Sequence, residues 1–170
     1  MFLETQRLRL RDWTVEDAED AFTIYGDPEV ARYLGTTGQP VPNVEKLREN
    51  LAKRIEKTKG QTMGFWALEL KGTGELIGGA LLQPLPDESD VEVGYHLGKR
   101  HWGKGYATEI ASRLVRYGFE DLGLKRIVGV TYPQNKASMR VLEKSGLTHR
   151  GQSKYGEVDV ELFVAERDVV

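Results

Sequence analysis

Glycine and positive charge concentrate in residues 100–108, whose sequence is RHWGKGYAT, between a predicted strand and a predicted helix. The first N–H groups of a helix have no partner within it, and the helix dipole adds about half a positive charge there. Gly103 and Gly105 let the backbone approach an anion closely, and Arg100 and Lys104 supply charge. The segment therefore predicts a phosphate or pyrophosphate site, although a tight turn that needs glycine only for its geometry would have a similar sequence.

A second interpretation of this segment is a P-loop, because residues 98–105 nearly match the pattern GxxxxGK(S/T). Gly105 stands where that motif has the hydroxyl that holds Mg²⁺, and no run of four apolar residues ending in Asp supplies a second metal ligand. With no cysteine, the chain has no thiolate for zinc or for an iron–sulfur cluster. A nucleotide-binding P-loop is therefore the weaker alternative, and we expect no metal site.

A carboxylate interrupts the otherwise apolar strand predicted over residues 91–97. Alternation along a strand places Glu92, Gly94 and His96 on one face and the residues between them on the other, unless a bulge near Gly94 breaks the pattern. A carboxylate in apolar surroundings has a raised pKa and can act as a general base. The simpler alternative is a glutamate on a side that faces solvent.

Asn135 and Ser138 form the third candidate group, at the start of another predicted helix. A separation of three residues puts both side chains on one helix face. Asparagine is also a preferred N-cap residue, and a serine one turn later is unremarkable, so an ordinary helix cap explains the pair as well.

Hydrophobic periodicity, glycine and proline define the elements that position these residues. We expect strands over residues 8–11, 65–70, 76–82, 91–97, 126–132, 147–154 and 159–164. We expect helices from Thr14 to Gly26, from Asp27-Pro28, and over residues 44–59, 107–122 and 135–144. The order of these elements predicts an α+β fold built on one mixed, mostly antiparallel sheet flanked by helices.

The composition excludes several classes of protein. The chain has 170 residues, of which 39% are hydrophobic and 29% charged, with a formal net charge of −2. This length suits one domain over residues 1–170, the apolar content excludes intrinsic disorder, and the near-neutral charge argues against direct nucleic-acid binding. The N-terminus lacks the features of a signal peptide, and no stretch approaches the roughly 20 apolar residues that span a bilayer. We therefore expect a cytoplasmic protein with no membrane association.

Together these motifs resemble those of the GNAT superfamily of N-acetyltransferases, and in particular its branch of ribosomal-protein-alanine N-acetyltransferases, over essentially the whole chain. Arg100-x-x-Gly103-x-Gly105 fits the family's acyl-CoA pyrophosphate motif, (Q/R)xxGx(G/A). Asn135-x-x-Ser138, followed by VLEKSG at residues 141–146, fits the next motif. Residues 3–11, 27–30 and 91–95 resemble the first strand, a helical turn and the fourth strand of that branch.

The resemblance implies a V-shaped opening between strands 91–97 and 126–132 that holds the pantetheine arm of acetyl-CoA. The backbone near Tyr95 would pair with this arm like an added strand, and Asn135 would contact it. The co-substrate contacts implied in this way are Tyr95, His96, Leu97, Arg100, Gly103, Lys104, Gly105, Tyr106, Ala107, Thr108, Asn135 and Ser138.

The resemblance also implies direct attack by an amine on the thioester carbonyl. Glu92 is the candidate base, directly or through water, and the N–H of Leu97 is the donor to the oxyanion. Ser138 is the candidate donor to the leaving thiolate, because residues 139–144 lack the tyrosine that many relatives have there. His96 and His101 compete as bases, since histidine titrates near pH 6.5, and we expect His101 to be exposed or near the phosphates.

The acceptor amine is expected to be a protein N-terminus or a small molecule, bounded by the loop over residues 35–43 and the hairpin around residues 154–157. Asp87, Glu88 and Asp90 could attract a cationic acceptor, although a solvated loop has the same composition. A non-catalytic acyl-CoA-binding or sensor module of the same fold is the alternative function. A homodimer is expected on symmetry grounds only.

Overall fold

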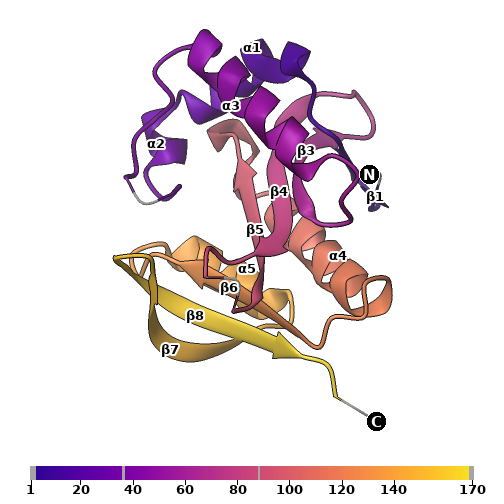
Figure 1. Cartoon of the computed structure of the whole chain (residues 1–170), viewed down its shortest axis with the longest axis vertical. Coiled ribbons are helices and arrows are strands. Elements are labelled where there is room, and N and C mark those ends of the chain that lie inside the picture. Colours follow the sequence, from indigo (N-terminus) through magenta and orange to yellow (C-terminus); the bar gives the residue numbers. More distant parts are fainter. Residues whose placement is uncertain (1–2, 36, 88, 169–170) are drawn as a thin grey trace.

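The computed structural model describes residues 3–35, 37–87 and 89–168. Within these residues one sheet of eight strands has the order β1-β2-β3-β4-β5-β6-β8-β7 (Figure 1). Neighbouring strands are antiparallel except β5 and β6, which are parallel. The strands are β1 (Leu3–Glu4), β2 (Leu8–Arg11), β3 (Gly64–Leu70), β4 (Leu76–Pro84), β5 (Val91–Leu97), β6 (Arg126–Thr131), β7 (Thr148–Tyr155) and β8 (Val158–Glu166).

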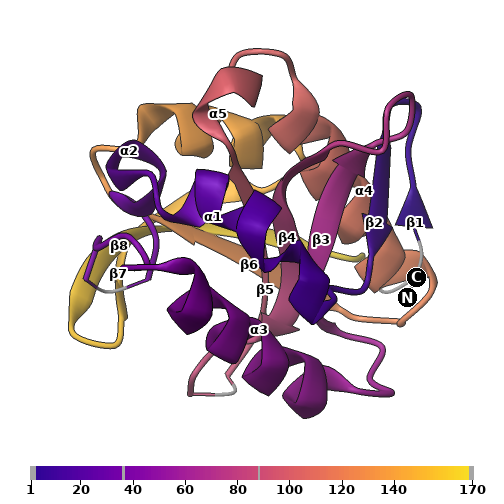
Figure 2. The ribbon, with the colours of Figure 1, turned by 90° about the horizontal axis from the view of Figure 1, so that it is seen from above.

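Helices cover both faces of this sheet, so that α3 and α4 lie on opposite sides of it (Figure 2). The α-helices are α1 (Ala18–Tyr25), α2 (Pro28–Ala31), α3 (Val44–Thr58), α4 (Tyr106–Glu120) and α5 (Lys136–Lys144). Two single turns of 3₁₀ helix occupy Val15–Asp17 and Lys99–His101. The α+β architecture expected from the sequence is therefore confirmed.

Local sequence signals account for most helix boundaries. The N–H of Thr14 donates to Oδ2 of Asp17 at 2.8 Å, as in a capping box. Asp27 caps α2 ahead of Pro28, and Asn43 caps α3. Several details differ from the prediction. The two-residue strand β1 was not among the expected strands, and Val15–Asp17, expected as the start of an α-helix, is a 3₁₀ turn. The segment before Gly103, expected as a loop, contains a 3₁₀ turn, and α4 begins at Tyr106 and ends at Glu120 instead of spanning residues 107–122.

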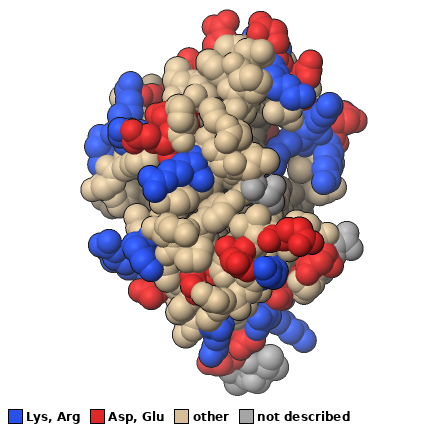
Figure 3. All heavy atoms as spheres, turned by 90° about the vertical axis from the view of Figure 1, so that its left-hand side faces the viewer, with Lys and Arg blue, Asp and Glu red and all other residues tan. Residues whose placement is uncertain are grey.

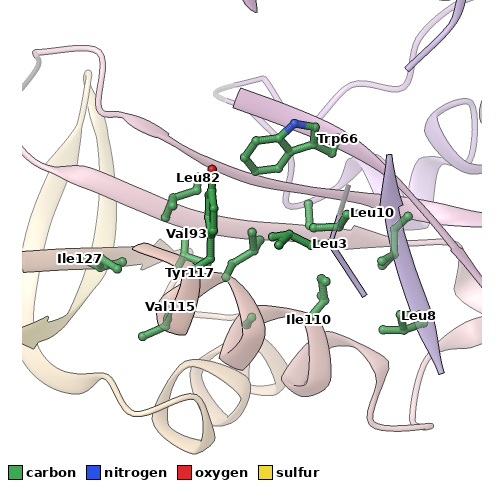
Figure 4. Packing of buried hydrophobic residues seen from close by; sticks show 14 of the residues in the cluster. Leu3, Leu8, Leu10, Trp66, Leu82, Val93, Ile110, Val115, Tyr117 and Ile127 are labelled. Carbon is green, nitrogen blue, oxygen red and sulfur yellow. The ribbon is translucent and has the colours of Figure 1, made fainter. Parts of the chain in front are cut away.

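Two apolar clusters hold the helices against the sheet. The larger one packs α4 on the side chains of β2 to β5, with Leu8, Ile110 and Leu114 fully buried (Figure 4). The smaller one packs α1 and α3 on the opposite face, around Trp13 and Leu51. Strand alternation explains the division, because adjacent residues of β3 belong to different clusters.

The sheet opens at the junction of β5 and β6. Glu92 and Val128 form the one registered pair between these two strands, whereas β5 pairs with β4 along its whole length. Beyond Glu92 the two parallel strands diverge, as the resemblance implied. The fold therefore leaves part of the β5 backbone without a neighbouring strand on the β6 side.

Candidate functional site

A cleft of about 860 Å³ occupies the place where β5 and β6 diverge. One side is formed by the start of α4 and by α5, and the other by α2, α3 and the tip of the β7–β8 hairpin. Figure 3 views the molecule from the side toward which α2 and this hairpin project, and uncharged residues cover most of the middle of that face. The cleft combines the three candidate groups of the sequence with parts of the chain that are distant from them.

The β5 backbone faces this cleft at Tyr95 and Leu97. The N–H of Gly98 donates to the carbonyl of Ile77 on the β4 side. Because successive residues of an antiparallel pair point their N–H and C=O groups to opposite sides, those of Leu97 and Tyr95 point away from β4. The indole N–H of Trp102 donates to the Leu97 carbonyl at 2.9 Å. The N–H of Leu97 is therefore directed toward the cleft.

The glycine-rich segment forms an uncapped helix N-terminus at the cleft. Gly103 and Gly105 have φ angles of 73° and 82°, in the left-handed region that favours glycine. Gly105 is the N-cap of α4 and provides no side-chain hydrogen bond to it. A Cβ atom on Gly103 would meet nothing within 4 Å, so open space adjoins this backbone. Gly103, Gly105, Tyr106, Ala107 and Thr108 all line the cleft.

Arg100 and Lys104, the two cations expected beside this segment, do not line the cleft. The Arg100 side chain is 76% exposed and forms an ion pair with Glu75. His101, expected to be exposed or near the phosphates, is only 6% exposed, and desolvation lowers its pKa. The electropositive character of the cleft at this point therefore comes from backbone N–H groups more than from these side chains.

Arg7 supplies a cation at this helix end that sequence reasoning missed. Its Nη1 donates to the carbonyl of Lys104 at 3.0 Å, and its Nε donates to Glu109 at 2.7 Å. The guanidinium also lies 4.5 Å from the centre of the Tyr106 ring. These contacts tie the loop between β1 and β2 to the first turn of α4. No local sequence signal predicts them, because Arg7 is about a hundred residues away in the chain.

Glu92 is buried inside the cleft, with an exposed fraction of 6%. Its Oε1 accepts hydrogen bonds from the Tyr155 hydroxyl at 3.1 Å and from Nε2 of Gln83 at 3.3 Å. Desolvation raises the pKa of this carboxyl, and the two hydrogen bonds oppose the shift. The solvent-facing alternative for Glu92 is therefore wrong, and the side chain has the environment that a general base near neutral pH requires.

His96 lies on the α1 side of β5, as alternation predicts. Its Nδ1 is 3.4 Å from the Tyr25 hydroxyl, and its ring packs against Tyr25 and Phe65. Desolvation lowers the pKa of His96 to about 4, so the imidazole is neutral at pH 7.

Ser138 is held at the start of α5 by Tyr95. The Tyr95 hydroxyl lies 2.9 Å from the Ser138 hydroxyl and donates to the Ser138 carbonyl at 3.1 Å. The Asn135 Oδ1 accepts from the N–H of Ser138 at 3.2 Å, so Asn135 acts as an N-cap while also lining the cleft. The structure thus brings a tyrosine hydroxyl next to Ser138 from β5, although α5 itself has no tyrosine.

The acceptor side expected from the resemblance also adjoins the cleft. Gly35 and Tyr155 line it, and the Tyr132 hydroxyl donates to the Gly35 carbonyl at 2.7 Å. Asp87 bonds to Ser89, and Asp90 pairs with Arg126. Neither of these two acids lines the cleft, and Glu88 is outside the described residues. The solvated-loop interpretation therefore applies to Asp87 and Asp90.

Two other kinds of site are absent from the described residues. Across the described parts of the chain, no three His, Cys, Asp or Glu side chains come together in a way that could hold a metal ion. Among those same residues, no helix has the length and apolar character needed to cross a membrane.

Comparison with known proteins identifies the family. Residues 7–148 match the family described as "Acetyltransferase (GNAT) domain". The chain is 34% identical over 169 residues to an uncharacterized N-acetyltransferase, p20, of Bacillus licheniformis, covering 95% of this chain and 93% of that one.

Solved structures agree with this assignment. A GNAT acetyltransferase from Bacillus anthracis superposes with a TM-score of 0.82 at 27% identity and covers 98% of both chains. The ribosomal L7/L12 α-N-protein acetyltransferase RimL, solved with coenzyme A, has the same fold, with a TM-score of 0.81 at 17% identity over 98% of both chains. The glycine-rich helix start, the diverging strands and the sequence matches lead to one conclusion: the chain belongs to the GNAT family and is an N-acetyltransferase.

Proposed function

We propose that this protein transfers the acetyl group of acetyl-CoA to a primary amine by direct attack of the amine on the thioester. The observation that carries the proposal is the buried Glu92 carboxylate, which shares one cleft with the uncapped N-terminus of α4. A base and an anion site in one cleft are the two features that this reaction needs from the protein.

The residues of the cleft fit the co-substrate. The N–H groups from Gly103 to Thr108 bind the diphosphate, because they lie at the positive end of the α4 dipole and adjoin open space. The backbone of β5 at Tyr95 and Leu97 binds the pantetheine amides in the manner of an added strand. Asn135 contacts the same arm from α5.

Glu92 acts on the amine. A free alkyl amine is mostly protonated at pH 7, and only its neutral form has the lone pair that attacks a carbonyl. Glu92 takes the proton from nitrogen, directly or through one water. Its raised pKa makes it a stronger base than an exposed glutamate.

Leu97 and Ser138 act on the thioester. As the new C–N bond forms, the N–H of Leu97 donates to the carbonyl oxygen, which becomes negative. The C–S bond then breaks, and the Ser138 hydroxyl, oriented by Tyr95, donates to the departing sulfur. As the C–S bond breaks, the nitrogen loses its second proton and the thiolate gains one, so the products are the acetylated amine and coenzyme A.

Calorimetric or thermal-shift titration tests the binding half of the proposal. Acetyl-CoA at a hundred times its dissociation constant should stabilise the fold by about 2.7 kcal/mol. ATP with Mg²⁺ serves as the matched control for a P-loop, and it should give no shift. Release of coenzyme A in the presence of a panel of amines tests the chemical half. Binding of acetyl-CoA without release of coenzyme A for any amine would favour the sensor alternative instead.

A further inference from the structure

Arg54 is a cation on the acceptor side of the cleft whose charge the mechanism does not use. It projects from α3 and lines the cleft. Its guanidinium lies 4.7 Å from the centre of the Phe65 ring, which orients it by a cation–π contact. Among the ion pairs found within residues 3–35, 37–87 and 89–168, none includes Arg54.

The charge of Arg54 acts at the place where the amine must react. Desolvation raises the pKa of Glu92 and lowers that of His96, and the positive charge of Arg54 acts in the lowering direction on both residues, which share one face of β5. The same charge opposes the raised pKa values that desolvation gives to Tyr25, on the α1 side, and to Tyr155, on the hairpin. Four groups from three elements, two of them on β5, therefore lie in the field of this guanidinium. No carboxylate lies within 4.0 Å of it among the described residues.

The other residues on the acceptor side of the cleft do not suit a polycation. Besides Glu92, the acid that lines the cleft on this side is Glu29, which pairs with Lys99 at 2.7 Å. Tyr33, Tyr132 and Tyr155 contribute neutral rings. A polyamine would need several carboxylates and would be repelled by Arg54.

We infer that the acceptor is an amine that also carries a carboxylate, as an amino acid does, and that Arg54 binds this carboxylate while the amine faces Glu92. The inference rests on the proposed function and assigns it a class of acceptor. Arginine presents a planar set of donors that matches a carboxylate with two parallel hydrogen bonds. The stack on Phe65 holds the guanidinium in place before the acceptor arrives.

The same charge assists the chemistry. An ammonium group bound near Arg54 is destabilised by the like charge, which favours the neutral amine. The carboxylate of the acceptor compensates the guanidinium, so the acceptor as a whole is attracted even though its ammonium is not. Specificity then arises because an amine without an anion lacks the two hydrogen bonds that a carboxylate accepts from Arg54.

Matched acceptors and matched variants test this inference. Each acceptor is used as the free amino acid and as its amide, with apolar or aromatic side chains, and spermidine represents polyamines. Arg54→Gln removes the charge, Arg54→Lys keeps the charge without the planar donors, and Lys53→Gln is the control. Lys53 is the neighbouring exposed residue of α3 and does not line the cleft.

The expected result is a selective loss of kcat/KM. Arg54→Gln should lower kcat/KM for amino acids about ten- to a hundred-fold, the range for a hydrogen bond to a charged group, and should change the value for their amides by less than about three-fold. The kcat/KM of Arg54→Lys for amino acids should lie between that of Arg54→Gln and that of the unmodified protein. The kcat/KM of Lys53→Gln should equal that of the unmodified protein. The dissociation constant of acetyl-CoA should be the same in all four proteins.

Several outcomes contradict the inference in different ways. The inference is overturned if Arg54→Gln lowers kcat/KM equally for amino acids and for their amides. It is also overturned if only spermidine and the amides are acetylated and Arg54→Gln does not change their kcat/KM. Both results leave the proposed function intact. Turnover of N-terminal peptides without turnover of free amino acids also overturns the inference alone. Absence of turnover with every acceptor, N-terminal peptides included, despite acetyl-CoA binding, overturns the proposed function and the inference with it.

Discussion

Replacing Glu92 by glutamine removes the candidate base with little other change. Both hydrogen bonds to this carboxylate, from Tyr155 and Gln83, are accepted by the same oxygen, Oε1. A glutamine whose amide oxygen occupies that position keeps both bonds, and its NH₂ group takes the place of Oε2. Glu92→Gln should therefore fold normally and bind acetyl-CoA with unchanged affinity.

The expected catalytic loss follows from the role of a general base. A positioned base contributes about 10²- to 10⁴-fold, which is about 2.7 to 5.4 kcal/mol in activation free energy at 1.36 kcal/mol per factor of ten. Initial rates of coenzyme A release at saturating acetyl-CoA measure this loss as a fall in kcat. The residual rate of the variant should rise with pH up to the pKa of the amine, because hydroxide and solvent then supply the neutral amine.

The pH dependence of the melting temperature of Glu92→Gln tests whether the Glu92 carboxyl is buried. The folded-state pKa of Glu92 is raised above 4.5, so its neutral form stabilises the fold below about pH 4.5, and this contribution is lost as pH rises through the folded pKa. Glutamine does not ionise. The melting temperature of Glu92→Gln relative to that of the unmodified protein should therefore be higher at pH 8 than at pH 4.

Three results would refute this reasoning about Glu92. A kcat within three-fold of the unmodified protein at pH 7.5 would exclude Glu92 as the base. Loss of acetyl-CoA binding would mean that glutamine disturbs the cleft, and a stability difference that is flat with pH would contradict the raised pKa. Glu56→Gln, on the exposed part of α3, is the matched control for removing one negative charge and should behave as the unmodified protein.

Three further substitutions test the anion site, the leaving-group donor and the core. Gly105→Ala forces a side chain into a left-handed backbone and should destabilise the fold by about 1–2 kcal/mol in urea unfolding, while weakening acetyl-CoA binding in thermal titration; unchanged stability and affinity would contradict the assigned geometry. Ser138→Ala should lower kcat about ten-fold with an unchanged melting temperature, because the Tyr95 hydroxyl keeps its bond to the carbonyl of residue 138, and an unchanged kcat in steady-state assays would exclude this donor. Phe163→Ala empties a fully buried position and should cost about 3–5 kcal/mol in urea unfolding, so a loss below 1 kcal/mol would mean that the cluster around it repacks.

Local signals in the sequence were sufficient to predict most of the helices and strands and one part of the site, but not the short strand β1. The positive φ angles at Gly103 and Gly105 follow from a glycine-rich strand-to-helix turn, and the separation of Tyr95 from His96 across β5 follows from strand alternation. The burial of Glu92 was one of two open alternatives, because the sequence does not show what covers a strand face.

Contacts between distant segments could not be predicted in this way. Tyr155 reaches Glu92 from the terminal hairpin, and Arg7 reaches Glu109 from the loop before β2. Their partners are set by strand order in the sheet, which no single segment encodes. Arg100, expected beside the phosphate, pairs with Glu75 across a distance in sequence that no local signal indicates, and its contact with the co-substrate stays a prediction.

The divergence of β5 from β6 also bears on aggregation. Strands without a neighbour expose N–H and C=O groups that can pair with another chain, and open sheet edges are a recognised hazard. Here the two unpaired edges face one another inside a cleft lined by helices, away from the rim of the sheet. At the rim, β1 has only two residues, and β7 is irregular between His149 and Gly151. The protein thus keeps a backbone template for a narrow, flexible ligand while offering little to the edge of another folded sheet.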